Sequence, residues 1–171
     1  RKPVSRSRAG PTGRPFSIRC GTSLLGRVID GLGDPIDGQG PLADAAGAAL
    51  AWWPVERAAP DPLKRRRVTE PLPFGVGAID AVATVGEGQR IGLFAGPGLG
   101  KSTLLGQIAR HTEADVIVIG LVGERGREVR DFLETQLDDE SRRRAVCVCA
   151  TSDAPPLLRL KSALAATASR S

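Results

Sequence analysis

Apolar residues in the second half of the chain recur with the periods of buried strands and amphipathic helices. Continuous apolar runs predict three strands, at residues 90–95, 116–122 and 145–150. Each run is followed by apolar residues at helical spacing, over residues 101–112, 127–137 and 155–168. Strand and helix thus alternate three times with short loops between them, which predicts an α/β fold with a parallel sheet.

The first half of the chain has weaker periodicity. Residues 24–38 are typical of a short apolar strand, a turn at Gly31 and Gly33, and a returning segment. Residues 39–73 are rich in Pro and predict a long surface connection with short extended pieces. This connection carries a basic cluster at residues 64–67, which is typical of a solvated or interface stretch. We expect no regular core within residues 1–19.

Charge is concentrated at one end of the chain. The formal net charge is +5, and residues 1–29 hold seven basic residues and no acidic ones. Because aromatic residues make up only 4% of the chain, a solvated terminal segment is favoured over a nucleic-acid-binding arm. The remaining residues carry slightly more acidic than basic side chains, so most of the molecule is expected to be nearly neutral.

Three Cys and no Met complete the compositional picture. Cys147 and Cys149 alternate within an apolar run, so they should share one strand face as small buried hydrophobes, and the Cys count fits a reducing compartment. No signal peptide is visible, and the longest apolar run is far shorter than the ~20 residues that span a bilayer. A Met-free chain beginning at Arg1 is expected to be part of a longer protein.

The most specific motif is a Gly-rich loop between a predicted strand and a predicted helix, the setting of a P-loop. Its members are Ala95, Gly96, Pro97, Gly98, Leu99, Gly100, Lys101, Ser102 and Thr103. The glycines let backbone N–H groups approach phosphate oxygens, and the helix adds free N–H groups and its positive dipole end. Lys101 should reach the β- and γ-phosphates of ATP, Ser102 should ligate Mg²⁺, and Thr103 should hold the α-phosphate side. Ala95 stands where the strict pattern has Gly.

A phosphate loop binds a nucleotide, but hydrolysis also needs a group that orients or activates water. Glu124 follows the 116–122 strand at the sheet edge where a parallel sheet binds ligands. It is either this group or a carboxylate favoured at a helix entry by the dipole, and its position leaves both interpretations open. Glu128 should lie inside the following helix.

Five segments in order resemble one family: residues 24–38, 75–80, 86–103, 121–129 and 150–158. They look like the ATPase of type III protein secretion systems, shared in kind by flagella and injectisomes and similar to the catalytic beta subunit of rotary ATP synthase. The resemblance implies a RecA-like P-loop core after a small β-barrel, in a ring hexamer with ATP sites between subunits. By motif match, Glu124 is the water-activating glutamate and Arg125 an adjacent arginine that supports the site. Gly126 and the sequence ATSDAPP resemble the secretion branch, and the latter resembles injectisome members more than flagellar ones.

The resemblance also divides the chain. Residues 1–20 would be a remnant of the β-barrel or a basic leader, residues 21–74 a hairpin and Pro-rich connection, and residues 75–171 the front part of the RecA-like domain. The family continues with an aliphatic strand that ends in a Mg²⁺-supporting Asp. Because the sequence stops before that strand, we expect an incomplete core, and the isolated chain should bind nucleotide weakly and be inactive as an enzyme.

The leading hypothesis is an ATP-hydrolysing hexameric motor subunit that energises type III secretion. The resemblance implies a cytoplasmic protein at the inner membrane of a bacterium. Its expected partners are stalk and stator proteins of the apparatus and effector–chaperone complexes, with no nucleic acid. Three alternatives remain: a rotary ATP synthase-type subunit, an RNA-driven hexameric terminator ATPase, and a non-catalytic nucleotide-binding subunit.

Overall fold

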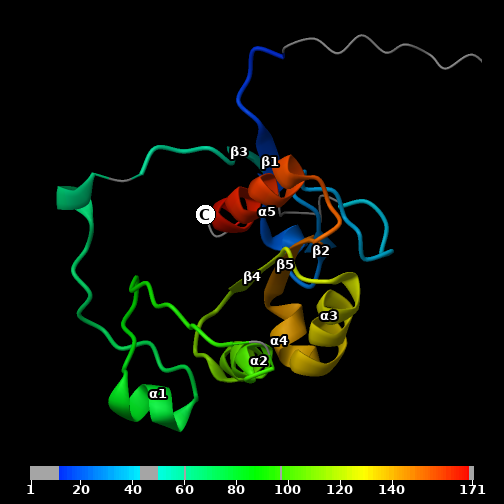
Figure 1. The fold of residues 1–171 in the computed structure, drawn as a ribbon. Coiled ribbons are helices and arrows are strands. Elements are labelled where there is room, and N and C mark those ends of the chain that lie inside the picture. Colours follow the sequence, from blue (N-terminus) through cyan, green and yellow to red (C-terminus); the bar gives the residue numbers. More distant parts are fainter. Residues whose placement is uncertain (1–11, 43–49, 60, 97, 170–171) are drawn as a thin grey trace, which may run out of the picture.

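A small parallel sheet forms the centre of the computed structural model, which describes residues 12–42, 50–59, 61–96 and 98–169. Its three strands lie in the order β2–β5–β4, with bounds Val28–Ile29, Ala145–Ala150 and Ile117–Val122. Every residue of the central strand β5 is buried. The parallel α/β fold predicted from the alternating pattern is therefore confirmed (Figure 1).

The register of the sheet decides where its loops meet. β4 pairs with β5 along its whole length, from Ile117 opposite Ala145 to Val122 opposite Ala150. β2 joins the other side of β5 from more than a hundred residues away in the sequence, with Val28 opposite Cys147. Because the three strands are parallel, the loops that follow them leave from the same edge of the sheet.

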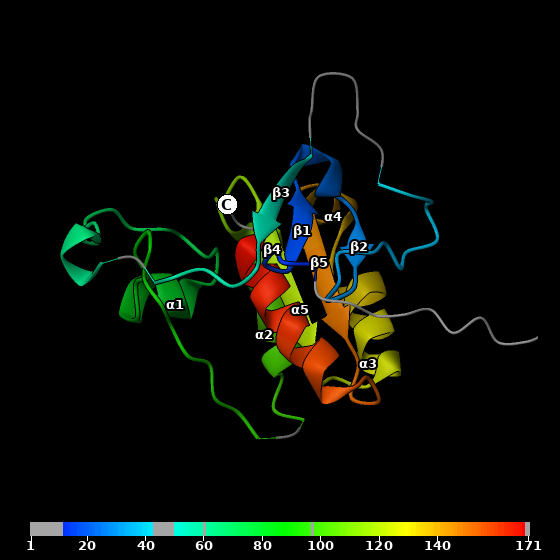
Figure 2. The ribbon, with the colours of Figure 1, turned by 90° about the horizontal axis from the view of Figure 1, so that it is seen from above.

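Helices cover both faces of the sheet (Figure 2). On one face, α5 (Pro156–Ala168) packs with Ile29, Val146 and Val148. The other face packs against three helical segments: α2 (Lys101–His111), α3 (Gly126–Asp131) and the π-helical turn η3 (Phe132–Gln136). The short helix α4 (Asp139–Arg143) contacts α2 and leads into β5. None of the helices in the described residues is long and apolar enough to span a membrane.

A two-stranded antiparallel ribbon extends the core beneath α5. It pairs β1 (Ser17–Cys20) with β3 (Ala51–Pro54), and Ile18 and Cys20 are buried in the cluster that contains α5. The expectation of no regular core within residues 1–19 is thus wrong for residues 17–19. The partner strand lies about thirty residues later, and such a distant pairing leaves no local signal. Residues 1–11 of the basic leader lie outside the described residues.

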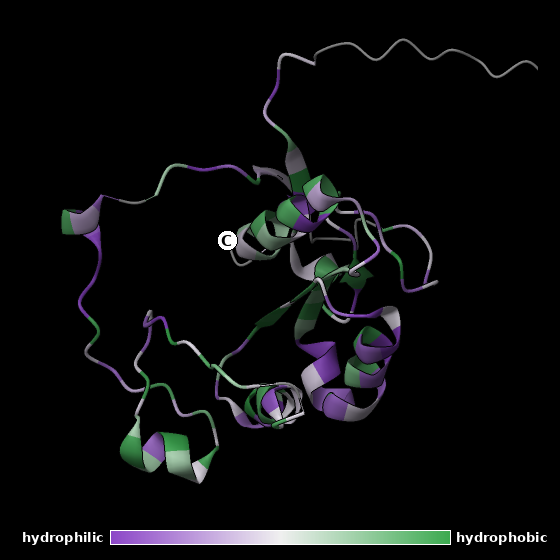
Figure 3. Ribbon diagram, viewed as in Figure 1, coloured by the Kyte–Doolittle hydropathy of each residue, from purple (hydrophilic) through white to green (hydrophobic). Residues whose placement is uncertain are grey.

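The predicted strand at residues 90–95 is also wrong, because these residues form no strand in the structure. The described part of the sheet places no strand beside them, so the apolar run has no hydrogen-bonding neighbour. Its side chains stay exposed, and Phe94 is 95% accessible. Figure 3 shows hydrophobic residues along β4 and β5 and more mixed character in this outlying region.

Three short helical elements complete the described fold. α1 (Gly77–Val82) and the turn η2 (Pro62–Lys64) lie in the same outlying region as residues 90–95, whereas η1 (Thr22–Leu24) lies next to β1.

The other predicted elements agree closely with the structure. β5 has the predicted bounds, and β4, α2 and α5 differ from the prediction by one residue at one end. The predicted helix at 127–137 is divided into α3 and η3.

Cys147 and Cys149 lie on one face of β5 against these helices, and burial raises the pKa values of their thiols to about 12 and about 11. They are therefore protonated, apolar core residues, as predicted.

The turn after β2 packs tightly against α5 at Gly31. A Cβ atom at this position would lie 2.4 Å from the Ser162 hydroxyl oxygen and 2.8 Å from the Leu158 carbonyl oxygen. Ser162 is fully buried in the middle of α5, so the helix has no room to yield. Contact between the turn and α5 therefore requires glycine here.

We expect Gly31→Ala to lower the free energy of unfolding by roughly 1–3 kcal/mol, because the added methyl group overpacks this contact. Urea denaturation followed by circular dichroism measures the change. Gly77→Ala is the matched control, since a Cβ at Gly77 meets no atom within 4 Å and alanine suits the helix α1. Equal unfolding midpoints for Gly31→Ala and the parent protein would contradict the tight contact.

Candidate functional site

The Gly-rich loop and the turn after β4 border a common hollow of about 540 Å³. Its walls come from the described loop residues between Ala95 and Thr103, together with Glu124 and Glu128. Pro97, also predicted to belong to the phosphate-binding loop, lies outside the described residues. The structure thus brings together two segments that the sequence placed at one sheet edge.

The loop enters α2 through two glycines with left-handed backbone angles. Gly98 has φ 75° and Gly100 has φ 81°, a region that other residues adopt at a cost. Gly100 is the N-cap of α2, and its carbonyl oxygen accepts the first helical hydrogen bond, from Leu104 N at 2.9 Å. The amides of Lys101, Ser102 and Thr103 therefore have no intrahelical acceptor and border the hollow. Free N–H groups and the positive end of the helix dipole suit an anion such as phosphate.

Lys101 and Glu124 face each other in this hollow. Lys101 Nζ lies 3.8 Å from Glu124 Oε1, and the two side chains are 45% and 40% exposed. This is an open ion pair in contact with water, of the kind that contributes little to stability. Both charged groups therefore remain accessible to a ligand.

The backbone around Glu124 is fixed to the end of β5. Gly123, with φ 82°, turns the chain out of β4, and its N–H donates to the Ala150 carbonyl oxygen at 2.7 Å. The Ser152 N–H donates to the Glu124 carbonyl oxygen at 2.9 Å. The position of the carboxylate thus follows from the parallel pairing of β4 with β5.

Arg125 and Glu128 are mainly engaged with each other. Arg125 is the N-cap of α3, and its backbone N–H donates to Glu128 Oε2 at 3.2 Å. The Arg125 guanidinium lies 3.9 Å from Glu128 Oε1 and is 67% exposed. Glu128 lies in the first turn of α3, as predicted, and also reaches the hollow. Arg125 does not line the hollow, so its supporting role stays a prediction from the motif.

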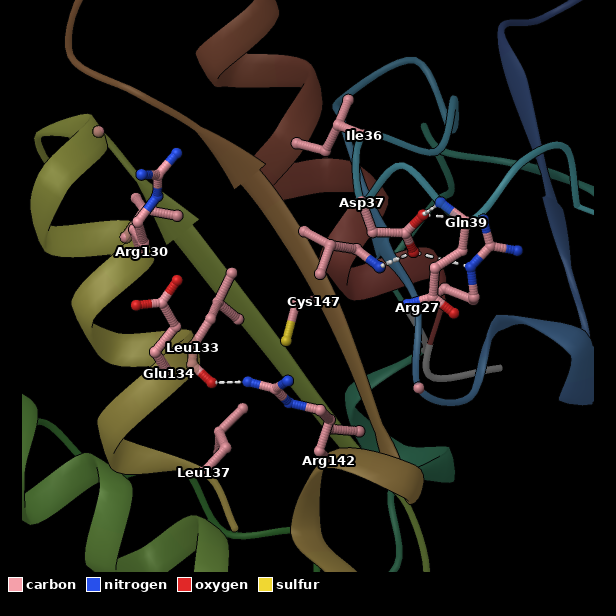
Figure 4. A pocket seen from close by; sticks show the side chains of 15 residues that line it. Arg27, Ile36, Asp37, Gln39, Arg130, Leu133, Glu134, Leu137, Arg142 and Cys147 are labelled. Atoms are coloured by element: carbon pink, nitrogen blue, oxygen red, sulfur yellow. Dashed lines mark hydrogen bonds and ion pairs between the residues drawn. The ribbon is translucent and has the colours of Figure 1, made fainter. Parts of the chain in front are cut away.

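A separate pocket of about 430 Å³ lies between the α3–η3 segment and residues 26–39 (Figure 4). Two of its polar groups pair with each other: Arg27 Nε donates to Asp37 Oδ2 at 2.7 Å, and the two side chains are 12% and 5% exposed. Asp37 also accepts from the Val28 and Gln39 amides at 3.0 Å. The Arg27 guanidinium, followed by these amides, holds the pKa of the Asp37 carboxyl well below its usual range. We assign this cluster a structural role, because its hydrogen bonds join β2 to the returning loop.

Comparison with known proteins identifies the family. The model of the ATP synthase alpha/beta family, nucleotide-binding domain, matches residues 75–169, more than half of the chain. The chain belongs to this family. Its matched segment contains the Gly-rich loop, Glu124 and Glu128, the residues that border the hollow.

Among the family's members, the chain is similar to both kinds of export ATPase. It is 51% identical over 156 residues to a type 3 secretion system ATPase of Xanthomonas euvesicatoria, covering 91% of this chain and 34% of that protein. It is 50% identical over 157 residues to the flagellum-specific ATP synthase of Bacillus subtilis, covering 92% and 35%. The resemblance inferred from the five segments is therefore confirmed. The chain spans about a third of the length of these relatives.

Solved structures agree with this placement. The assembled ATPase EscN of the enteropathogenic E. coli type III secretion system matches with a TM-score of 0.80 and 44% identity, over 97% of this chain and 40% of that chain. EscN in complex with its central stalk EscO matches with a TM-score of 0.79 and 46% identity, over 90% and 37%. The described fold is therefore that of the corresponding part of a secretion ATPase.

The buried Arg27–Asp37 pair predicts a pH-dependent difference in stability. Asp37→Asn leaves the Arg27 guanidinium without its carboxylate, so the free energy of unfolding should fall by about 3 kcal/mol at neutral pH. Because the pKa of Asp37 is lowered in the folded state, its contribution is complete above the unfolded pKa of ~3.9 and is lost as the pH falls below that value. The difference between the two proteins should therefore shrink in acid.

Urea titrations at neutral and acidic pH measure this difference. Asp34→Asn is the control, since Asp34 is an exposed carboxylate in the same loop. A difference for Asp37→Asn that is small at neutral pH, or that grows in acid, would contradict the structural role of the pair.

Proposed function

We propose that this chain is the nucleotide-binding part of an ATPase that energises type III protein secretion. The observation that carries the proposal is the meeting of Lys101 and Glu124, 3.8 Å apart, in one hollow bordered by the free amides of a helix N-terminus. A phosphate-binding ammonium ion and a carboxylate in this arrangement suit phosphoryl transfer to water. In this proposal, residues 75–171 form the front part of the RecA-like domain.

The phosphate groups of ATP would lie over the Gly-rich loop. Its glycines leave space for the chain of phosphates, since a Cβ at Gly98 or Gly100 would meet no atom within 4 Å. The amides of the first turn of α2 would donate to phosphate oxygens, and the Lys101 ammonium would neutralise the terminal charge. The Lys101–Glu124 pair is solvent-exposed, so a phosphate can replace the carboxylate as the partner of Lys101 at low cost.

Magnesium fits the residues that border the hollow. Mg²⁺ prefers oxygen ligands, keeps several waters and binds largely through substrate phosphates. Ser102 lies in the first turn of α2 on the wall of the hollow, so its hydroxyl would hold the ion beside the phosphates. The bound ion would neutralise charge that develops on the phosphates during transfer.

Glu124 is the better of the two carboxylates for orienting water. The Glu128 carboxylate already accepts from the Arg125 amide and faces the Arg125 guanidinium. Glu124 faces Lys101, whose ammonium group would bind the terminal phosphate. When that phosphate replaces the Glu124 carboxylate as the partner of Lys101, the freed carboxylate would lie beside the phosphate. Arg125 would act through the cap that it shares with Glu128, as a support for the turn.

The wider biological role rests on the relatives. The EscN structures describe an assembled ATPase and its central stalk, so we propose a ring hexamer of the parent protein with a stalk partner. Stator proteins and effector–chaperone complexes complete the proposed partners, at the cytoplasmic side of a bacterial inner membrane. The relatives from the secretion and flagellar branches are nearly equally identical to this chain, so the sequence ATSDAPP carries the assignment to an injectisome.

Lys101→Ala should weaken ATP binding by roughly tenfold to a hundredfold, because charge-assisted hydrogen bonds to phosphate are lost. Titration of the purified protein with a fluorescent ATP analogue measures the dissociation constant. Lys64→Ala removes the same charge from an exposed position in η2 and should bind like the parent protein. Unchanged affinity in Lys101→Ala would refute the proposed phosphate site.

Glu124→Gln should retain nucleotide binding and lower kcat by roughly 10²–10⁴-fold, because a neutral amide cannot accept the proton of the attacking water. Phosphate release by the full-length protein measures turnover. Glu128→Gln is the comparison, since it neutralises the other carboxylate of the hollow. A larger loss in Glu128→Gln than in Glu124→Gln would transfer the role to Glu128, and normal turnover in both would refute the proposed use of water activation here.

A further inference from the structure

The side chain of Arg144 binds the far end of the phosphate-loop helix. Nη1 donates to the carbonyl oxygens of Thr112 at 2.9 Å and Ala114 at 2.5 Å. Nη2 reaches the carbonyl oxygens of Ala109 at 3.4 Å and Arg110 at 3.3 Å. One guanidinium group thus binds the last turn of α2 and the loop that leaves it. A cation at a helix C-terminus satisfies carbonyl groups that have no partner within the helix and complements the negative end of the dipole.

The backbone of the same residue begins the sheet. Arg144 is the C-cap of α4 and directly precedes β5, and its carbonyl oxygen accepts from the N–H of Ile117, the first residue of β4, at 3.0 Å. Arg144 therefore joins the end of α2 to the beginnings of β4 and β5. Figure 1 shows α2 and α4 next to each other, in agreement with their contact in the structure.

The neighbouring charged side chains, Arg110 and Asp138, make other contacts, and it is Arg144 that joins α2 to the sheet. Arg110, also in the last turn of α2, donates to the Gln136 carbonyl oxygen at 2.6 Å and so fixes the helix to η3 instead. Asp138 caps α4, where Ser141 lowers the pKa of its carboxyl, and the positive charges of Arg110 and Arg144 add to this effect. The Asp138 carboxylate thus offsets part of the positive charge of the two guanidinium groups.

The proposed catalytic groups lie at the opposite ends of the two elements that meet at Arg144. α2 has 11 residues, begins with Lys101 and spans ~16 Å. β4 has six residues, spans ~20 Å and leads directly to Glu124. A tilt of ~4° at the Arg144 end would displace the Lys101 end by ~1 Å over that length. A displacement of this size at reacting groups can lower turnover by ~100-fold.

We propose that Arg144 is a positioning residue that fixes the angle between α2 and β4, and thereby the distance between the Lys101 ammonium and the Glu124 carboxylate. The inference rests on the proposed ATPase function. Its consequence is specific: nucleotide binding depends on α2 and its loop alone and should survive loss of Arg144. Turnover depends on α2 and β4 together and should fall.

The test is steady-state ATP hydrolysis by the full-length protein. Arg144→Gln, confirmed as folded by circular dichroism, should lower kcat by roughly 10–100-fold with little change in KM for ATP. Arg144→Lys keeps the charge but replaces the fork of donors by one ammonium group. Its kcat should therefore lie between those of the parent protein and Arg144→Gln. Arg143→Gln is the matched control, because Arg143 is the exposed neighbour in α4 and should keep the parental kcat.

Each outcome decides the proposal. Parental kcat in folded Arg144→Gln overturns it, as does a rise in KM with kcat unchanged, which would indicate a role in binding. If Arg144→Gln does not fold, parental kcat in Arg144→Lys overturns it, and an intermediate kcat with unchanged KM supports it.

If the unaltered protein hydrolyses no ATP, the proposed ATPase function is refuted, and a measurement other than turnover is needed for Arg144. Amide hydrogen exchange at residues 112 and 117 then decides the inference: faster exchange in Arg144→Lys than in Arg143→Gln supports it, and equal exchange overturns it.

Discussion

Parallel pairing of β4 with the fully buried strand β5 is the constraint on which the site depends. A strand buried on both faces must satisfy its backbone through neighbouring strands, and β5 does so with β4 on one side and β2 on the other. The pairing holds the turn after β4 at the end of β5, where Gly123 and Glu124 exchange backbone hydrogen bonds with the chain leaving β5. The Glu124 carboxylate consequently faces Lys101 although the residues between them form a helix, a loop and a strand.

The elements that could be predicted from the sequence are those whose environment is local or uniform. β5 is apolar on both faces, and α2 and α5 carry their apolar residues at helical spacing. These patterns are sufficient to predict the three elements from the sequence. β1 and β2 are short and find their partners far along the chain, and their sequences do not encode those partners. Residues 90–95 show the opposite case, because an apolar run becomes a strand only when another strand lies beside it.

The residues of the candidate site and of the further inference divide in the same way. The Gly-rich loop could be found from the sequence because its glycines and its place before a helix are visible there, and the phosphate binding that we propose for it uses backbone groups. Glu124 needed the order of strands in a parallel sheet as well. Arg144 gave no signal, because an arginine before a strand acquires meaning only when the end of α2 packs against it. Contacts between a side chain and distant carbonyl groups are the kind of information that only the folded arrangement supplies.

Two ion pairs of the same chemistry show how solvent exposure separates structure from function. The Arg27–Asp37 pair is largely buried and shares its carboxylate with backbone amides, so removing one partner leaves an uncompensated charge. The Lys101–Glu124 pair is nearly half exposed, and water can replace either partner. A ligand phosphate that competes for Lys101 therefore meets little resistance, whereas no ligand could separate Arg27 from Asp37 without opening the loop. The exchangeable Lys101–Glu124 pair lies at the start of α2, whereas the buried Arg27–Asp37 pair lies at the start of β2. Charge can therefore be rearranged at the Gly-rich loop without loosening the core.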